Sequence, residues 1–201
     1  MDKEDGIFMK IMKQKIKLLC PQLIFLIVTF CIFMPSSLFL GNLDEFAVGF
    51  TALIPLLMAA SLITAAVVIL IGLIVPKKIC NIYAAVIFGG ALAAYVQGNF
   101  LNPDFGVLNG RQIQWSQFKV NGIISTVVWI VLIVVPAVIV CFKKDIMTNI
   151  IKWGSLFLSS IQVVTLVVLI VSSKRSVDYS YVVTKNDEFA LSSQGNVVVF
   201  I

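Results

Sequence analysis

The chain has 201 residues, of which 60% are hydrophobic and only 12% are charged, with a formal net charge of +5. A soluble domain carries about 25% charged and about 45–50% apolar residues, so this composition excludes an ordinary soluble globular protein and a disordered one. With so few polar side chains the chain cannot cover its apolar surface for water, and we expect it to fold in lipid. Histidine is absent, which excludes a His-based triad or a His-ligated metal within these residues.

The first seventeen residues are basic and amphipathic. Lys10, Lys13 and Lys17 share one helical face, and most apolar residues of the segment share the other. We predict that residues 1–17 form a cytoplasmic N-terminal segment. Two interpretations stay open, a short interfacial helix on an anionic inner leaflet and an ordinary basic flank of the first membrane span. A cleaved signal peptide is disfavoured, because no A-x-A site follows the apolar run.

Five stretches are long and apolar enough to be membrane helices, which need roughly 20 residues to cross about 30 Å of hydrocarbon. None of the five contains Asp, Glu, Lys or Arg. Residues 18–173 are therefore predicted to form a five-helix transmembrane domain, and the fold class is an all-α polytopic membrane protein. The predicted spans are Leu18–Leu40, Phe46–Val75, Ile79–Val96, Gly122–Phe142 and Trp153–Ser173.

Local signals mark several span boundaries. The segment Asn42–Glu45 predicts an N-cap for the second span, with acidic residues in the first helical turn. The short Pro76–Lys78 turn predicts that the second and third spans form an antiparallel hairpin. Pro21, Pro55 and Pro136 lie within spans, where they predict kinks or positions in a first turn.

The distribution of basic residues predicts the orientation. If the N-terminus is cytoplasmic, ten of the fifteen basic residues lie on the cytoplasmic side. The positive-inside rule therefore favours a cytoplasmic N-terminus in a multi-pass protein of the cell membrane. An odd number of spans then places the C-terminus outside the cell. The ten residues are Lys3, Lys10, Lys13, Lys15, Lys17, Lys77, Lys78, Lys143, Lys144 and Lys152.

The third span carries small residues at helical spacing. Gly89 with Ala93, and Gly90 with Ala94, are small-xxx-small pairs that allow a neighbouring helix to approach closely. We predict that this span is the central packed helix of the bundle, and a homodimer seam is the alternative. The four cysteines have no zinc or C-x-x-C spacing, so we interpret them as buried free thiols.

Gln162 is the most polar residue inside the predicted spans, and Ser159, Ser160 and Thr165 lie near it. We interpret Gln162 as the donor or acceptor of an interhelical hydrogen bond. Transporters usually place ionisable groups inside the membrane, and these spans contain none. Five spans also cannot divide evenly into inverted repeats, so a small transporter is disfavoured.

The predicted outer loop over residues 97–121 is the candidate functional segment. Its Asn-Pro and Asn-Gly pairs are turn signals, its aromatic residues suit a membrane interface, and its arginine suits a lipid phosphate. A surface loop that only caps the bundle is the alternative interpretation. One aspartate makes neither a metal site nor a general acid, so no catalytic, cofactor-binding or metal-binding residue is predicted. The candidate lipid- or substrate-facing residues are Asn99, Asp104, Asn109, Arg111 and Trp115.

The composition changes after the fifth span, over residues 174–201. A turn cluster at Ser192–Asn196 precedes the β-branched run Val197–Ile201, which is typical of a buried strand in a parallel sheet. Functional groups of open α/β sheets lie just past the carboxyl ends of strands. We therefore expect residues 174–201 to be an extracellular linker and the first strand of a truncated α/β domain.

This architecture resembles the membrane part of bacterial sulfatase-type envelope enzymes. These include the lipoteichoic acid synthase group and related phosphoglycerol transferases of the alkaline-phosphatase superfamily. The resemblance rests on the five spans, the Gln97–Leu101 segment with Asn109-Gly110, and the final segment Gln194–Ile201. It implies an extracellular α/β catalytic domain with a divalent metal and a Thr, Ser or modified Cys nucleophile. The metal-binding acid at the end of the first strand would follow Ile201, so no catalytic residue can be assigned here.

The expected function is to anchor such an enzyme and to hold its active domain near a lipid-linked or cell-wall glycopolymer substrate. The expected partner is membrane lipid, and no nucleic acid is expected. A complete, non-enzymatic small membrane protein that assembles with a partner is the alternative. The oligomeric state, the substrate and the choice between hydrolysis and group transfer stay open.

Overall fold

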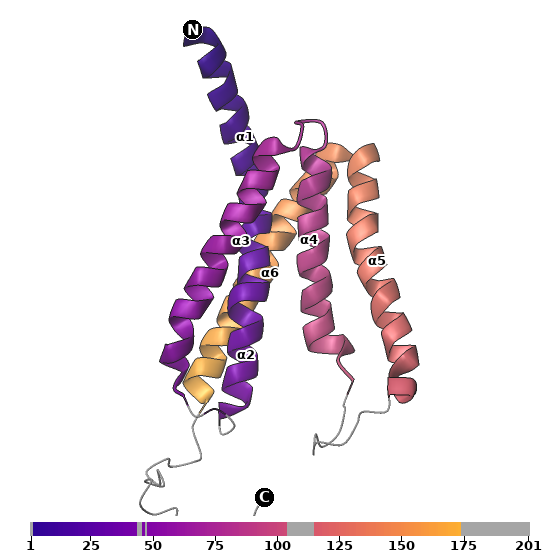
Figure 1. Cartoon of the computed structure of the whole chain (residues 1–201). Helices are drawn as coiled ribbons and strands as arrows, with labels where there is room; N and C mark the ends of the chain where they lie inside the picture. Colours follow the sequence, from indigo (N-terminus) through magenta and orange to yellow (C-terminus); the bar gives the residue numbers. More distant parts are fainter. Residues whose placement is uncertain (1, 44–45, 47, 104–114, 174–201) are drawn as a thin grey trace, which may run out of the picture.

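The computed structural model describes residues 2–43, 46, 48–103 and 115–173, and for residues 2–5, 7 and 8 it describes the backbone alone. In this part of the chain every regular element is a helix, and five segments are long and apolar enough to cross a membrane. They stand side by side as a bundle (Figure 1). The all-α, five-span prediction is therefore confirmed for the described residues. The predicted linker and strand over residues 174–201 lie outside them.

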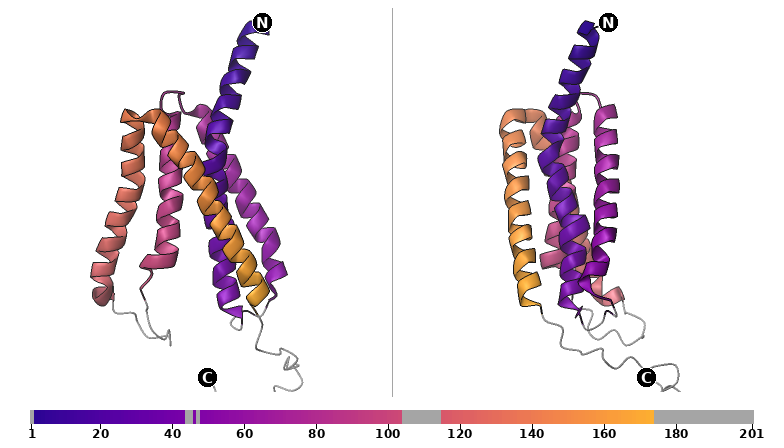
Figure 2. Two further views of the ribbon diagram at one scale, coloured as in Figure 1. Left: turned by 180° about the vertical axis from the view of Figure 1, so that it is seen from behind. Right: turned by 90° about the vertical axis from the view of Figure 1, so that its left-hand side faces the viewer.

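The first span is one continuous rod. It consists of α1 (Asp2–Ile27), the π-helical turn η1 (Val28–Phe33) and α2 (Met34–Gly41). Pro35 at the start of α2 explains the π turn, because a proline ring inside an α-helix clashes with the carbonyl one turn earlier. The wider turn relieves this clash, and the Met34 amide donates to the Thr29 carbonyl instead. The first turns of α1 project beyond the other helices (Figure 2), so the basic segment is a helical flank of the span.

The second span begins later than predicted. The 3₁₀ turn η3 (Phe50–Leu53) leads into α3 (Ile54–Ile74), and Pro55 lies in its first turn, where the missing N–H weakens no hydrogen bond. Asn42 was expected to cap this helix, and that prediction is wrong. Asn42 instead ends α2, where its side-chain amide donates to the Leu38 carbonyl at 2.8 Å. The Phe39 and Phe46 rings stack 4.5 Å apart, which holds the chain against α2 before α3 starts.

The other three spans, by contrast, are longer than predicted. The third span comprises α4 (Cys80–Val96) and the π turn η4 (Gln97–Leu101), and Pro76–Ile79 forms the tight turn before it. The fourth comprises η5 (Trp115–Phe118) and α5 (Lys119–Phe142), and the fifth is α6 (Lys144–Ser172). Both flanks of the predicted outer loop are therefore helical. The first turns of α6 are polar yet helical, because Asp145 suits the helix N-terminus and Met147 and Ile151 are buried.

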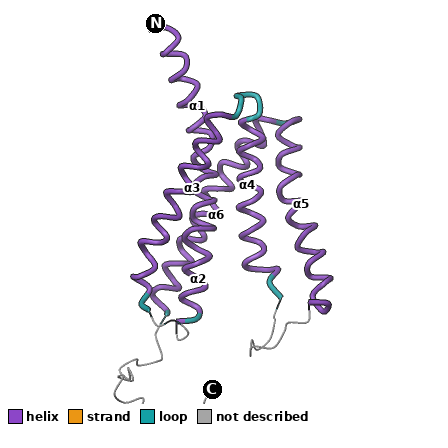
Figure 3. The backbone as a smooth tube through the Cα atoms, in the orientation of Figure 1, coloured by secondary structure: helices purple, strands orange, loops and turns teal. Residues whose placement is uncertain are grey.

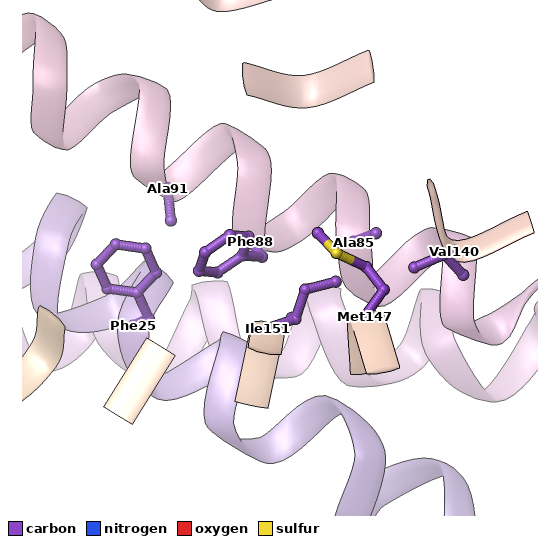
Figure 4. Close-up of a cluster of buried hydrophobic side chains, with 7 residues drawn as sticks. All are labelled: Phe25, Ala85, Phe88, Ala91, Val140, Met147 and Ile151. Carbon is purple, nitrogen blue, oxygen red and sulfur yellow. The ribbon is translucent and has the colours of Figure 1, made fainter. Parts of the chain in front are cut away.

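The third span is the packed centre of the bundle, as predicted. Its most apolar window is 44% buried, against 33% or less for the other four. Gly89 permits a close approach of two helices, because a Cβ atom there would overlap the Leu132 carbonyl oxygen of α5. Gly90, by contrast, has open space around it. The core cluster in Figure 4 joins α4 to α1, α5 and α6 and consists of Phe25, Ala85, Phe88, Ala91, Val140, Met147 and Ile151.

All four cysteines are free thiols, as predicted. The expectation that they are buried holds for Cys31 and Cys80 and is wrong for Cys20 and Cys141, which are exposed. The two exposed thiols lie on helix faces that the bundle leaves open. Exposure of a weakly polar thiol on an apolar helix is compatible with contact to lipid.

The bundle has two distinct ends (Figure 3). The N-terminal end carries the projecting turns of α1, the Pro76–Ile79 turn and Lys143. The far end carries Asn42 at the end of α2, the start of α3 and Ser173 after α6. The described chain therefore enters at one end of the bundle and leaves at the other.

Candidate functional site

A polar groove opens at the far end, where α2 faces the π turn η4. Its volume is about 410 Å³. We call it the amide groove, because asparagine side chains provide most of its polar atoms. It is lined by Phe33, Met34, Ser37, Leu38, Asn42, Gly98, Asn99 and Asn102.

Each polar side chain of the amide groove is held by its own helix. Asn99 donates to the Tyr95 carbonyl at 2.7 Å, Asn42 to the Leu38 carbonyl at 2.8 Å, and Ser37 to the Met34 carbonyl at 3.0 Å. These bonds use one N–H or O–H of each group. Among the described residues, the side-chain oxygens of Asn42 and Asn99 accept no hydrogen bond, and both residues line the groove, so they are available to a bound donor.

A second layer of contacts holds the π turn in place. The Trp129 indole of α5 donates to the Gln97 side-chain oxygen at 3.3 Å, and the Gln97 amide donates to Asn102 at 3.2 Å. Gly98 lies close to α2, because a Cβ atom there would lie 2.7 Å from the Met34 methyl. The turn is therefore tied to both α5 and α2, which fixes the position of Asn99.

The chemistry of the amide groove is hydrogen bonding without charge. None of its lining side chains is ionisable, and the amides and the hydroxyl can both donate and accept. The apolar atoms of Phe33, Met34 and Leu38 form the rest of the wall. Such a surface suits a neutral, hydroxyl-rich group with an apolar part, and the described residues that line it include no general acid or base.

The structure places two of the five candidate residues. Asn99 lines the amide groove, and Trp115 begins η5 with 66% of its surface exposed. Asp104, Asn109 and Arg111 lie outside the described residues. The sequence analysis missed Ser37 and Asn42, which α2 contributes from another part of the chain. The polar residues near the end of the first span were the available signal, but nothing in the sequence paired them with Asn99.

A separate polar seam runs between the first rod and α6. Thr29 and Gln162 bond to each other across it, because the Gln162 amide donates to the Thr29 hydroxyl at 3.0 Å. Thr29 in turn donates to the Phe25 carbonyl at 2.7 Å. This confirms the interpretation of Gln162 as an interhelical hydrogen-bonding residue. The seam consists of Gln22, Thr29 and Ser36 on the rod and Ser155, Ser159 and Gln162 on α6, all buried.

The spacing within the seam fixes how the two helices pair. Gln22, Thr29 and Ser36 recur every seven residues, and so do Ser155 and Gln162, which places each set on one helix face. The seam contains no ionisable group, so it provides no carboxylate or amine for ion binding or proton relay. We interpret the seam as a contact that fixes how far along each other the first rod and α6 pack, since both helices run in the same direction.

The described residues contain no group of three or more acidic, cysteine or histidine side chains that could hold a metal ion. Comparison of the chain with protein-family models, with curated proteins and with solved structures found no match. The functional argument therefore rests on the geometry of the bundle and on the chemistry of its two ends.

Proposed function

We propose that this bundle is the membrane anchor of a cell-envelope enzyme of the sulfatase or phosphoglycerol-transferase type. In this proposal the N-terminal end faces the cytoplasm, and the segment after Ser173 lies outside the cell. The divalent metal and the Thr, Ser or Cys nucleophile implied by the sequence resemblance belong to a domain on that far side, where a metal would activate the nucleophile and stabilise charge on the transferred group.

The observation that carries this proposal is the charge asymmetry between the two ends. Cationic side chains gather at the N-terminal end, whereas Lys119 is the one cation among the described residues at the far end. By the positive-inside rule, the lysine-rich end is the cytoplasmic one. The lysines at the N-terminal end whose side chains are described are Lys10, Lys13, Lys15, Lys17, Lys77, Lys78, Lys143 and Lys144, with Lys152 about two turns further along α6.

The amide groove supports the second half of the proposal. It lies at the same end as Ser173, so a group bound there would be near whatever follows α6. Its neutral amides and apolar wall match the polar and apolar parts of a lipid-linked glycan. The bundle would thus anchor the enzyme and also hold its substrate at the membrane surface.

The test is to treat intact host cells with a protease that cannot cross the membrane. We expect release of a folded fragment that hydrolyses a phosphodiester or sulfate ester only when a divalent metal is present, while the bundle stays in the membrane. An endogenous protein of 22.1 kDa that releases no fragment and co-purifies with a stable partner would contradict the proposal. That result would favour the complete, non-enzymatic membrane protein instead.

A further inference from the structure

A second cleft lies at the N-terminal end, between α1 and α6. Its volume is about 400 Å³, and almost all of the surface that lines it is apolar. We call it the α1–α6 cleft. It is lined by Lys13, Ile16, Lys17, Cys20, Pro21, Ile24 and Leu156.

The helix orders these residues along the membrane normal. Lys13 and Lys17 are one turn apart on the same face of α1, and Pro21 and Ile24 continue that face deeper into the bundle. At 1.5 Å per residue, Ile24 lies about 10 Å below Lys17. Leu156 of α6 borders the cleft on the other side, and the cleft is shallow and open to its surroundings. The cleft therefore has a cationic entrance and an apolar interior.

The two lysines at this entrance have no partner among the described residues. Lys15, which points to the other side of α1, donates to the Leu73 and Val75 carbonyls, and Lys77 donates to Gln14. Lys13 and Lys17 are exposed and form no hydrogen bond or ion pair in the described part of the chain. The acidic residue of α1 nearest to Lys13 in the sequence is Asp5, which is about 12 Å away along the helix axis.

Further positive charge lies along α1 and on α6, the two helices that line the cleft. On the same helix, Lys10 lies one turn before Lys13 and shares the exposed face of α1 with Lys13 and Lys17. On α6, Lys152 lies one turn before Leu156, and its ammonium is 5.0 Å from the centre of the Trp153 ring. An exposed tryptophan beside a lysine is typical of the membrane–water interface. The entrance therefore lies at the depth of lipid headgroups.

We propose that the α1–α6 cleft binds one anionic phospholipid from the leaflet at the N-terminal end. Its phosphate contacts the Lys13 and Lys17 ammonium groups, and an acyl chain lies along Pro21, Ile24 and Leu156. A basic pocket between membrane helices is a favourable site for an anionic headgroup. A soluble anion would leave the apolar interior empty, and a zwitterionic headgroup would bring its own cation next to the lysines.

The experiment measures lipid binding to the full chain by native mass spectrometry in a neutral detergent. The probes are phosphatidic acid, phosphatidylcholine and glycerol 3-phosphate, so the lipid, the headgroup charge and the soluble anion are tested separately. The Lys13→Gln/Lys17→Gln double variant should bind phosphatidic acid about tenfold more weakly than the unmodified chain. The matched control, Lys143→Gln/Lys144→Gln, removes the same charge at the same end, from two exposed lysines with no described side-chain hydrogen bond, and it should bind normally.

A second variant tests the apolar half of the site. Ile24 is 40% exposed, so Ile24→Trp should fill the cleft without disturbing the core, and it should weaken phosphatidic acid binding while both lysines remain. All variants should keep the unfolding temperature of the unmodified chain in lipid-free detergent. Equal loss in both lysine pairs, binding of phosphatidylcholine as tight as that of phosphatidic acid, or equally tight binding of glycerol 3-phosphate would overturn the proposal. None of these measurements depends on the proposed enzymatic function or on the orientation of the bundle.

Discussion

Single small residues decide how closely the helices of this bundle approach. Helices in lipid gain little from burying apolar surface against one another, so close packing and interhelical hydrogen bonds stabilise their association. Gly89 permits the contact of α4 with the α5 backbone, and Thr29 with Gln162 joins the first rod to α6. The sequence pattern identified Gly89 and Gly90 equally, but only Gly89 faces a neighbouring helix.

Substitution of these two glycines should therefore have different effects. Gly89→Ala should lower the free energy of unfolding by about 1–3 kcal/mol, because the new Cβ atom would overlap the backbone of α5. Gly90→Ala, the matched control, should leave it unchanged or raise it by up to about 1 kcal/mol, because alanine favours the helix and the space is open. Unfolding in mixed micelles measures both values. Equal effects would mean that α4 and α5 do not meet at Gly89.

At the scale of elements, helix ends depend on contacts with other helices. The π turn η4 ends the third span at the far end, whereas η1 lies within the first rod, before α2. Pro35 explains η1, and the sequence analysis did not recognise it as a proline inside a span. At the N-terminal end, α3 ends where Lys15 of α1 donates to its Leu73 and Val75 carbonyls at 2.8 and 2.6 Å. A cation at this position also interacts favourably with the helix dipole.

Loss of this contact should loosen the last turn of α3. Lys15→Met keeps the length of the side chain but removes its charge and its donors, and it should lower the free energy of unfolding by about 1–2 kcal/mol. The Val75 amide, which bonds to the Ile71 carbonyl, should exchange its hydrogen faster. Lys78→Met is the control, because Lys78 is exposed and has no described hydrogen bond. Unchanged exchange at Val75 in the Lys15 variant would show that α3 ends without help from α1.

At the scale of the whole molecule, the odd number of described spans places the start and the end of the described chain at opposite ends of the bundle. The lysine-rich end, the α1–α6 cleft and the helical flank lie together, and the amide groove and Ser173 lie together at the other end. This polarity is what the proposed anchoring function requires. It also gives the orientation a direct test that uses described residues at both ends.

Single cysteines report the orientation. Val48→Cys marks the far end and Lys78→Cys marks the N-terminal end, and both positions are exposed. With Cys20 and Cys141 replaced by alanine, a maleimide that cannot cross the membrane should label position 48 in intact cells and position 78 only after lysis. The reverse pattern would place the N-terminus outside and the amide groove in the cytoplasm.

The sequence by itself determined the number of spans, the role of Gln162 in an interhelical hydrogen bond and the concentration of lysines at one end of the bundle. These follow from local quantities, namely the length of apolar runs and the positions of lysines, which do not depend on how the helices pair. Some helix boundaries were predicted wrongly, because they depend on contacts between segments. Asn42 ends α2 beside the Phe39–Phe46 ring stack, and α6 begins early because Met147 and Ile151 are buried against other helices.

The pairing itself was decided only by the tertiary structure. Helices that are apolar on nearly every face carry no strong pattern that orients one face inward, and lipid is as apolar as their own side chains. Thr29 therefore meets a partner 133 residues away, and α2 joins η4 in one groove, by the fit of small and polar residues. The same packing left two lysines of α1 over an apolar cleft, which spacing along the chain could not reveal.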